Sequence, residues 1–146
     1  MQSVQVMANQ PNNLNLQLSS RPENINMVED YVQRIKNTYQ VSEEVGFNIL
    51  LVLTEAVNNC IIHGNAANPS KNVEVNLKSQ QKILCFTVSD EGTGFDPKIL
   101  PDPTSPEHID QPNGRGVFLM RELSDHMQYS NCGRKVELHF KIAKKS

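Results

Sequence analysis

The stretch TEAVNNCIIHGN, residues 54–65, places a carboxylate and two carboxamides at the end of an apolar run. The five residues before it, 49–53, are all aliphatic, which is typical of a helix with a buried face. Residues four apart on a helix share a face, so Glu55 and Asn59 are expected one turn apart. A carboxylate beside a core is costly unless it is paired or borders a cavity. This pair can supply a general base and a hard ligand for Mg²⁺. Alternatively, Glu55 is simply exposed and the asparagines fray the helix end.

The surrounding pattern predicts a single domain over residues 14–146, preceded by a flexible lead-in at residues 1–13. Ser42 is expected to cap the helix that contains Glu55, and Gly64 to end it in the left-handed conformation. Apolar periodicity predicts helices at 25–35, 42–62 and 117–127, and strands at 14–18, 73–77, 83–88 and 136–142. This order predicts an α+β fold, a two-layer α/β sandwich with helices on one face of a mixed, mainly antiparallel sheet.

The composition excludes several classes of protein. The chain has 146 residues and a formal net charge of −2, with Lys and Arg scattered, so we expect no direct nucleic-acid or membrane partner. No uninterrupted apolar run approaches the roughly 18 residues that span a bilayer, and the polar N-terminus does not resemble a secretory signal. The three cysteines are far apart, so neither a disulfide framework nor a zinc knuckle is expected. We therefore expect a reduced, soluble, cytoplasmic domain.

A second polar segment, DEGTGFD at residues 90–96, follows the predicted buried strand that ends near Val88. A carboxylate at a strand end, here Asp90, can accept a hydrogen bond from an amino group such as that of adenine. Gly92 and Gly94 lack side chains, so the backbone can turn sharply and a planar ring can approach it. The alternative is an ordinary surface turn, in which Asp and Gly are common.

A third segment, NGRGVFLM at residues 113–120, leads from a long loop into the last predicted helix. Residues 90–116 hold five of the eight prolines and four of the seven glycines, and a loop of this length is usually a functional lid. A glycine loop at a helix start presents free N–H groups and the positive end of the helix dipole to an anion. Arg115 can add a charged donor to a phosphate or point into solvent. In this order, the three segments describe a nucleotide site with metal, base and phosphate contacts.

The motifs EAVNNxxxHG, DEGTGFD and GRGVFLM resemble the N, G1 and G2 boxes of the Bergerat-fold (GHKL) ATPases, which include gyrase, Hsp90, histidine kinases and MutL. Within this group the chain is most similar to the anti-sigma-factor serine/threonine kinases of bacterial stress-response and sporulation switches. The resemblance extends from Leu14 to Ile142 and implies a histidine-kinase-like ATP-binding domain.

The resemblance implies a role for each matching residue. Glu55 matches the general base, Asn59 the Mg²⁺ ligand, and Asp90 the residue that reads adenine, with Gly92 and Gly94 beside the ring. The end of the lid and the phosphate-binding helix start match residues that we expect to bind nucleotide: Asn113, Gly114, Arg115, Gly116 and Val117.

Two departures from the family pattern stand out. The family often has Gly-Thr-x-Val before the final strand, with the threonine helping to hold adenine. Here the sequence is Gly133-Arg134-Lys135-Val136, without a threonine. The segment Asp102–Gln111 is acidic and interrupted by prolines, so we expect the lid to close differently or stay mobile.

The implied function is an ATP-dependent kinase with ATP or ADP and Mg²⁺ as ligands. The implied protein partners are a sigma factor, an antagonist protein phosphorylated on Ser or Thr, and a second copy of the chain in a homodimer. A non-catalytic, nucleotide-responsive module that sequesters a partner is the alternative. A detached histidine-kinase catalytic domain is a third hypothesis, which the short lid disfavours. Retention of Glu55 favours the enzyme, because a pure binder gains nothing from an unpaired carboxylate there.

Overall fold

The computed structural model describes residues 4–6, 14–92, 112–131 and 133–142. Within them, one six-stranded sheet has the spatial order β1-β2-β3-β4-β6-β5. Every neighbouring pair of these strands is antiparallel, where the sequence predicts a mixed, mainly antiparallel sheet. The strands span Val4–Val6 (β1), Leu14–Ser19 (β2), Asn72–Gln80 (β3), Ile83–Ser89 (β4), His126–Ser130 (β5) and Lys135–Lys141 (β6).

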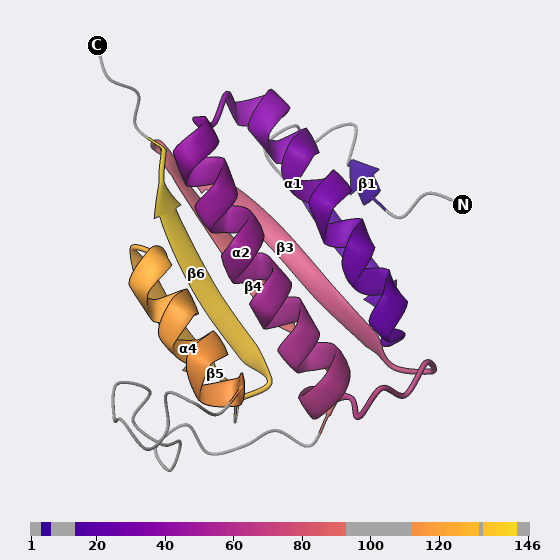
Figure 1. Cartoon of the computed structure of the whole chain (residues 1–146). Helices are drawn as coiled ribbons and strands as arrows, with labels where there is room; N and C mark the ends of the chain where they lie inside the picture. The colour runs from indigo at the N-terminus through magenta and orange to yellow at the C-terminus, as the bar shows by residue number, and fades with distance from the viewer. Residues whose placement is uncertain (1–3, 7–13, 93–111, 132, 143–146) are drawn as a thin grey trace.

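The helices lie together on one face of this sheet (Figure 1), which confirms the predicted α+β two-layer architecture. They are α1 (Asn26–Tyr39), α2 (Glu43–Asn59) and α4 (Pro112–Leu123). A short 3-10 helix, η1 (Pro22–Ile25), leads into α1, and a π-helical turn, η2 (Cys60–Gly64), continues α2. The helix α2 packs against both α1 and α4, so it lies between them in the helical layer.

The core lies between the helices and the sheet, and strand alternation decides which side chains enter it. In β3, for example, Val73, Val75 and Leu77 are buried while their neighbours are partly or fully exposed. Three aromatic rings from α1, β4 and β6 meet edge to face, with centroids 6.4 Å apart for Tyr31 and Phe86 and 5.9 Å apart for Phe86 and Phe140. The opposite face of the sheet carries the alternate, mainly polar residues.

Helix α2 is the central element of the helical layer. The Ser42 hydroxyl accepts a hydrogen bond from the backbone N–H of Val45 at 3.2 Å, which confirms the predicted N-cap. By length and hydropathy, Glu43–Gly64 could cross a membrane. However, its apolar side, including Ile49, Val52 and Leu53, is buried in the core, as in the central helix of a globular domain.

Three local features differ from the sequence predictions. The strands β1 and β5 were not predicted, and α4 begins at Pro112 rather than at residue 117. Gly114–Gly116 therefore lie inside the helix rather than in a loop before it. The helical segment ends at Gly64 as predicted, but Gly64 does not have the predicted left-handed conformation, because the one described glycine with a positive φ is Gly133, at 82°.

Candidate nucleotide-binding site

The first half of the site is a contact between the last turns of α2 and the second turn of α4. A Cβ built on Gly116 would lie 2.5 Å from Glu55 Oε1 and 3.8 Å from Asn59 Nδ2. Glu55 and Asn59 therefore project from one face of α2 toward Gly116, as the helical spacing predicts. Both side chains are half-buried, so they border the core and remain accessible to a ligand.

The second half is the close packing of Gly64 and Gly92 around Asp90. A Cβ on Gly64 would collide with the Asp90 carboxylate, and a Cβ on Gly92 would collide with the carbonyl oxygen of Gly64. The end of η2 and the turn after β4 are therefore in contact, with no room for a methyl group at either glycine. The physical role of Gly64 is this close approach, because its backbone does not adopt a left-handed conformation.

Backbone and side-chain hydrogen bonds fix the position of Asp90 at the end of β4. Its N–H donates to the Arg134 carbonyl at 3.0 Å, and its Oδ1 accepts from the Gly92 N–H at 2.8 Å. The thiol of buried Cys60, the residue after Asn59, lies close enough to Asp90 for the Asp90 charge to act on it. Burial, and then the Asp90 charge, raise the pKa of the Cys60 thiol well above its usual value, so the thiol stays protonated.

Asn65 is a buried residue of the site that the sequence analysis did not identify. Its Nδ2 donates to Ser20 Oγ at 2.8 Å and to the Asn72 carbonyl at 3.0 Å. Its Oδ1 accepts from the Glu91 N–H at 2.8 Å. One side chain, 1% exposed, thus ties the end of η2 to the segment after β2, the first residue of β3 and the segment after β4. The position of Asn65 directly after a predicted helix end is a local pattern that could have marked it as a candidate. Its hydrogen-bond partners are remote in the sequence, however, so that pattern does not predict them.

Some predicted site residues lie partly or wholly outside the described part of the chain. Gly94 lies outside it, as does the acidic segment Asp102–Gln111. The side chains of Asn113 and Arg115 are likewise not described, although their backbone forms the first turn of α4. Gly114 belongs to the same turn, whose N–H groups have no intrahelical partner. Val117, in the next turn, is buried at 9% exposure.

Arg134 occupies the position at which the family pattern often has threonine. Its backbone carbonyl accepts from the Asp90 N–H, and its Nε donates to the Asn131 carbonyl at 3.2 Å. The position therefore still supports Asp90, but through the main chain rather than through a hydroxyl group.

Together, these contacts place two sets of polar groups around the C-terminal end of α2. One set offers a carboxylate and an amide beside the first turns of α4, where backbone N–H groups suit an anion. The other offers the acceptor Asp90 beside two glycines. Carboxylate and amide oxygens are the donors that Mg²⁺ prefers, so the donor set of Glu55 and Asn59 fits that ion.

A comparison with known families places this geometry in context. The model of the histidine kinase-like ATPase domain matches residues 18–140, most of the chain. The chain belongs to this family. The resemblance inferred from the three motifs is therefore confirmed, and both sets of polar groups lie within the matched region.

The chain is similar in sequence to bacterial proteins that are named as an anti-sigma factor or as protein kinases. The chain is 31% identical to an anti-sigma F factor of Geobacillus thermodenitrificans over 143 residues, which cover 91% of this chain and 94% of the relative. It is 21% identical to the serine-protein kinase RsbW of Oceanobacillus iheyensis, over 81% of this chain and 78% of the relative. It is 26% identical to the serine/threonine-protein kinase BtrW of Bordetella bronchiseptica, over 60% of this chain and 63% of the relative.

Proposed function

We propose that this protein is an ATP-dependent serine/threonine-protein kinase of the anti-sigma-factor type. The observation that carries the proposal is the convergence of the Glu55–Asn59–Gly116 contact and the Asp90–Gly64–Gly92 contact on one end of α2. Membership of the histidine kinase-like ATPase family and similarity to anti-sigma factors and serine-protein kinases support it.

In this proposal the nucleotide extends from Asp90 to the first turns of α4. Asp90 accepts a hydrogen bond from the adenine amino group, and Gly92 and Gly94 lie beside the ring. The phosphates lie toward the first turn of α4, next to Gly116, where the free N–H groups and the helix dipole favour negative charge. The residues proposed to complete the phosphate contacts are Asn113, Gly114, Arg115 and Val117.

Asn59 would hold Mg²⁺, which when bound neutralises charge on the triphosphate. Glu55 is proposed as the general base. As the seryl or threonyl hydroxyl oxygen of the antagonist forms its bond to the γ-phosphorus, the bond to the β,γ-bridging oxygen breaks and ADP leaves. The hydroxyl proton passes to the Glu55 carboxylate. Most of the rate enhancement comes from positioning and charge stabilisation, as is usual for phosphoryl transfer.

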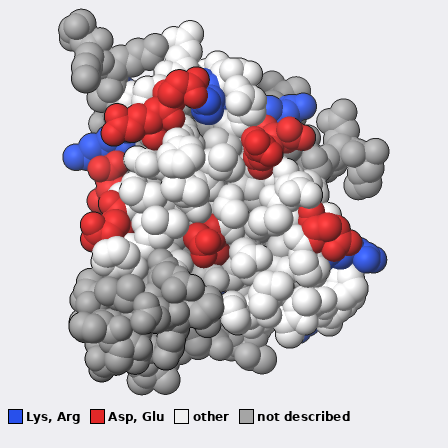
Figure 2. All heavy atoms as spheres, in the orientation of Figure 1, with Lys and Arg blue, Asp and Glu red and all other residues white. Residues whose placement is uncertain are grey.

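The proposed partners are a sigma factor, which the protein sequesters, and a small antagonist protein, which it phosphorylates. We also propose that the chain acts as a soluble, cytoplasmic homodimer. Among the side chains coloured in Figure 2, acidic groups are more prominent than basic ones on the helical face, and the basic groups shown lie mainly near its margins rather than in one patch. This distribution agrees with protein partners better than with nucleic acid.

The test is transfer of the labelled γ-phosphoryl group of ATP·Mg²⁺ to the antagonist that co-purifies with the protein. We expect Glu55→Gln to bind ATP within about twofold of wild type and to lose transfer by at least about a hundredfold. Glu44→Gln is the matched control, because Glu44 is an exposed glutamate in the first turn of the same helix. It should transfer at the wild-type rate.

Two results would contradict the proposal in different ways. Equal transfer by wild type and Glu55→Gln would remove Glu55 from the mechanism. Tight ATP binding by wild type without any transfer would leave the non-catalytic sequestering module as the function.

A further inference from the structure

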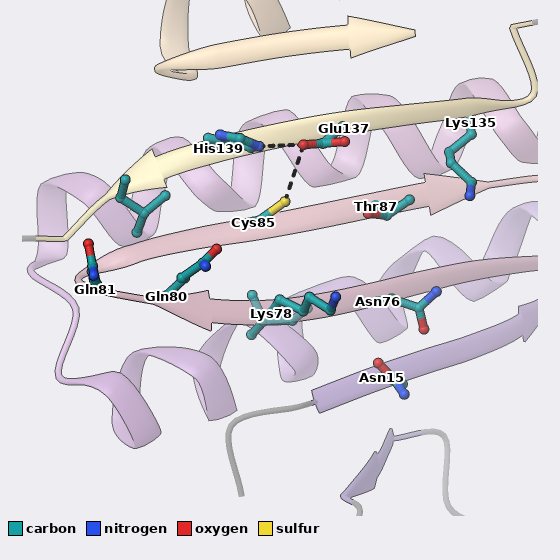
Figure 3. A pocket seen from close by; sticks show the side chains of 12 residues that line it. Asn15, Asn76, Lys78, Gln80, Gln81, Cys85, Thr87, Lys135, Glu137 and His139 are labelled. Carbon is teal, nitrogen blue, oxygen red and sulfur yellow. Dashed lines mark hydrogen bonds and ion pairs between the residues drawn. The ribbon is translucent and has the colours of Figure 1, made fainter. Parts of the chain in front are cut away.

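The helix-free face of the sheet carries a second group of polar side chains, remote from the proposed nucleotide site. Figure 3 shows this face, with the helices behind it. A hollow of about 760 Å³ lies along it, lined by residues of β2, β3, β4 and β6. On the β4–β6 side of the hollow, Cys85, Glu137 and His139 point toward one another.

Strand register explains why these three side chains meet. Cys85 of β4 is the direct antiparallel partner of His139 of β6, so the two side chains point to the same face. Glu137 lies two residues before His139 on β6, which places it on that face as well. The cluster is therefore built on three positions of two paired strands rather than on a loop.

The side-chain atoms converge on one oxygen. Glu137 Oε2 lies 2.7 Å from His139 Nε2 and 3.7 Å from Cys85 Sγ. One ligand atom from each residue lies within 4.8 Å of the other two. Without a metal, His139 contacts this oxygen as a hydrogen-bonded or ion-pair partner, and the Cys85 thiol donates a hydrogen bond to it.

We propose that Cys85 Sγ, Glu137 Oε2 and His139 Nε2 form a binding site for Zn²⁺. In a tetrahedral zinc site with bonds of about 2.0–2.3 Å, ligand atoms lie roughly 3.3–3.7 Å apart. The sulfur–oxygen distance of 3.7 Å already fits this geometry. The nitrogen–oxygen distance of 2.7 Å needs to open by about 0.6 Å, which a small rotation of the carboxylate provides.

The chemistry of the ligands decides which metal the site takes. A thiolate and an imidazole favour zinc and related thiophilic ions over Mg²⁺ and Ca²⁺. The thiol proton is released to solvent as the sulfur–zinc bond forms. Burial and the Glu137 charge raise the pKa of the Cys85 thiol to about 11, so without metal this cysteine is a protonated thiol and not a reactive nucleophile.

The surroundings of the Cys85–Glu137–His139 cluster leave room for a metal ion to enter and for a fourth ligand to bind that ion. The His139 and Glu137 side chains are 30% and 45% exposed, so a metal can reach them from solvent and keep a water in its fourth position. His126 of β5 is the register partner of His139, and the two rings lie 4.7 Å apart between centroids. The His126 ring thereby helps to hold the His139 ring in place.

The test uses the full, untagged chain, reduced and free of nucleotide and Mg²⁺. Titration with Co²⁺ should give a thiolate-to-cobalt charge-transfer band and visible d–d bands that saturate at one equivalent, and Zn²⁺ should abolish them. A hundredfold excess of Zn²⁺ over its dissociation constant should raise the melting temperature by about 5 °C or more. Cys85→Ser, Glu137→Gln and His139→Asn should each weaken Zn²⁺ binding by at least tenfold.

His63→Asn is the matched control, because His63 is an exposed histidine in η2, on the helical layer. It should bind Zn²⁺ as wild type does. Absence of the charge-transfer band, its persistence in Cys85→Ser, or equal loss of binding in His63→Asn would each overturn the zinc site. If one ligand variant does not fold, Zn²⁺ binding by the ligand variants that do fold still tests the proposed site. These outcomes are independent of the proposed kinase activity, because nucleotide binding is measured separately and should be unchanged in the three ligand variants.

Discussion

Gly116 of α4 and the carboxylate of Glu55 on α2 are in direct contact. A Cβ added at residue 116 would lie 2.5 Å from Glu55 Oε1, a separation that real Cβ atoms essentially never show. The proposed general base is therefore positioned by the absence of a side chain on a neighbouring helix. Because α4 begins four residues earlier, at Pro112, this contact also links Glu55 to the helix end proposed to hold phosphate.

We expect Gly116→Ala to impair phosphoryl transfer without unfolding the protein. The added methyl group displaces the Glu55 carboxylate, so the transfer rate should fall at least about tenfold, since a 1 Å misplacement of a catalytic group is costly. The steric cost is offset in part by the helix propensity of alanine, which exceeds that of glycine by about 1 kcal/mol. Labelled-ATP transfer and urea unfolding measure the two effects.

Gly46→Ala provides the control for this experiment. Gly46 also lies inside a helix, but its added Cβ would meet the flexible side chain of Lys36, at 2.7 Å from Cδ. That side chain can move away, so transfer should stay at the wild-type rate. If both alanine variants lose transfer to the same extent, the contact with Glu55 is not the cause.

We expect Asn65→Ala to destabilise the fold and weaken ATP binding together. The substitution leaves the Glu91 N–H, the Asn72 carbonyl and the Ser20 hydroxyl without this partner in a buried setting. Each unsatisfied buried group costs about 1–3 kcal/mol, so the free energy of unfolding should fall by roughly 2–4 kcal/mol. Urea denaturation gives this value, and calorimetry with ADP gives the affinity.

Asn68→Ala is the comparison for Asn65. Asn68 is an exposed asparagine in the same loop, and within the described part of the chain its Oδ1 accepts hydrogen bonds only from nearby Ser70, at 3.0 and 2.7 Å. Its loss should change stability by no more than about 0.5 kcal/mol. A similar destabilisation by both substitutions would show that Asn65 is not a special link between the segments of the site.

The contrast between Ser42 and Asn65 shows which features could be predicted from the sequence. Ser42 caps α2 through a bond to Val45, three residues away, so a local pattern was sufficient. The partners of Asn65 lie up to 45 residues away, and no local pattern encodes them. The strand β5 was missed for a related reason: it is an edge strand in which every described residue is partly or fully exposed. The pairing of Cys85 with His139 likewise depends on sheet register, which motif spacing does not reveal.

Tyr31 gives the fold a stability that depends on pH. Its hydroxyl is buried and donates to the Leu14 carbonyl at 2.8 Å. Burial, and then Tyr39, raise the pKa of Tyr31 above its ordinary value of 10.0. A pKa that is raised in the folded state contributes stability that is complete below the unfolded-state value and is lost as the pH rises above it. The free energy of unfolding should therefore fall above about pH 10.

Tyr31→Phe should reduce stability at pH 7 by about 1–2 kcal/mol, because the Leu14 carbonyl loses its partner. The same substitution should make the decline above about pH 10 shallower, because one buried ionisable group is gone. Urea unfolding of both proteins across this range measures the two slopes. A parallel decline in wild type and Tyr31→Phe would show that Tyr31 is not a source of the alkaline instability.

Gly64 and Asp90 allow the second half of the site to be tested in isolation. Gly64 has no left-handed backbone, so alanine introduces no conformational strain there, and its Cβ meets the Asp90 carboxylate. We expect Gly64→Ala to weaken ADP binding at least tenfold, which corresponds to about 1.4 kcal/mol. The effect should arise from displacement of Asp90, the proposed acceptor for the adenine amino group.

A double-mutant cycle with Asp90→Asn identifies the route of this effect. If Gly64→Ala acts by displacing Asp90, its cost to ADP affinity should largely disappear in the Asp90→Asn background, because the acceptor is already altered. Isothermal titration calorimetry of the two single variants and the double variant gives the coupling energy. Additive losses would mean that the methyl group disturbs nucleotide binding by another path, such as the contact between Gly64 and Gly92, and that the proposed adenine contact needs revision.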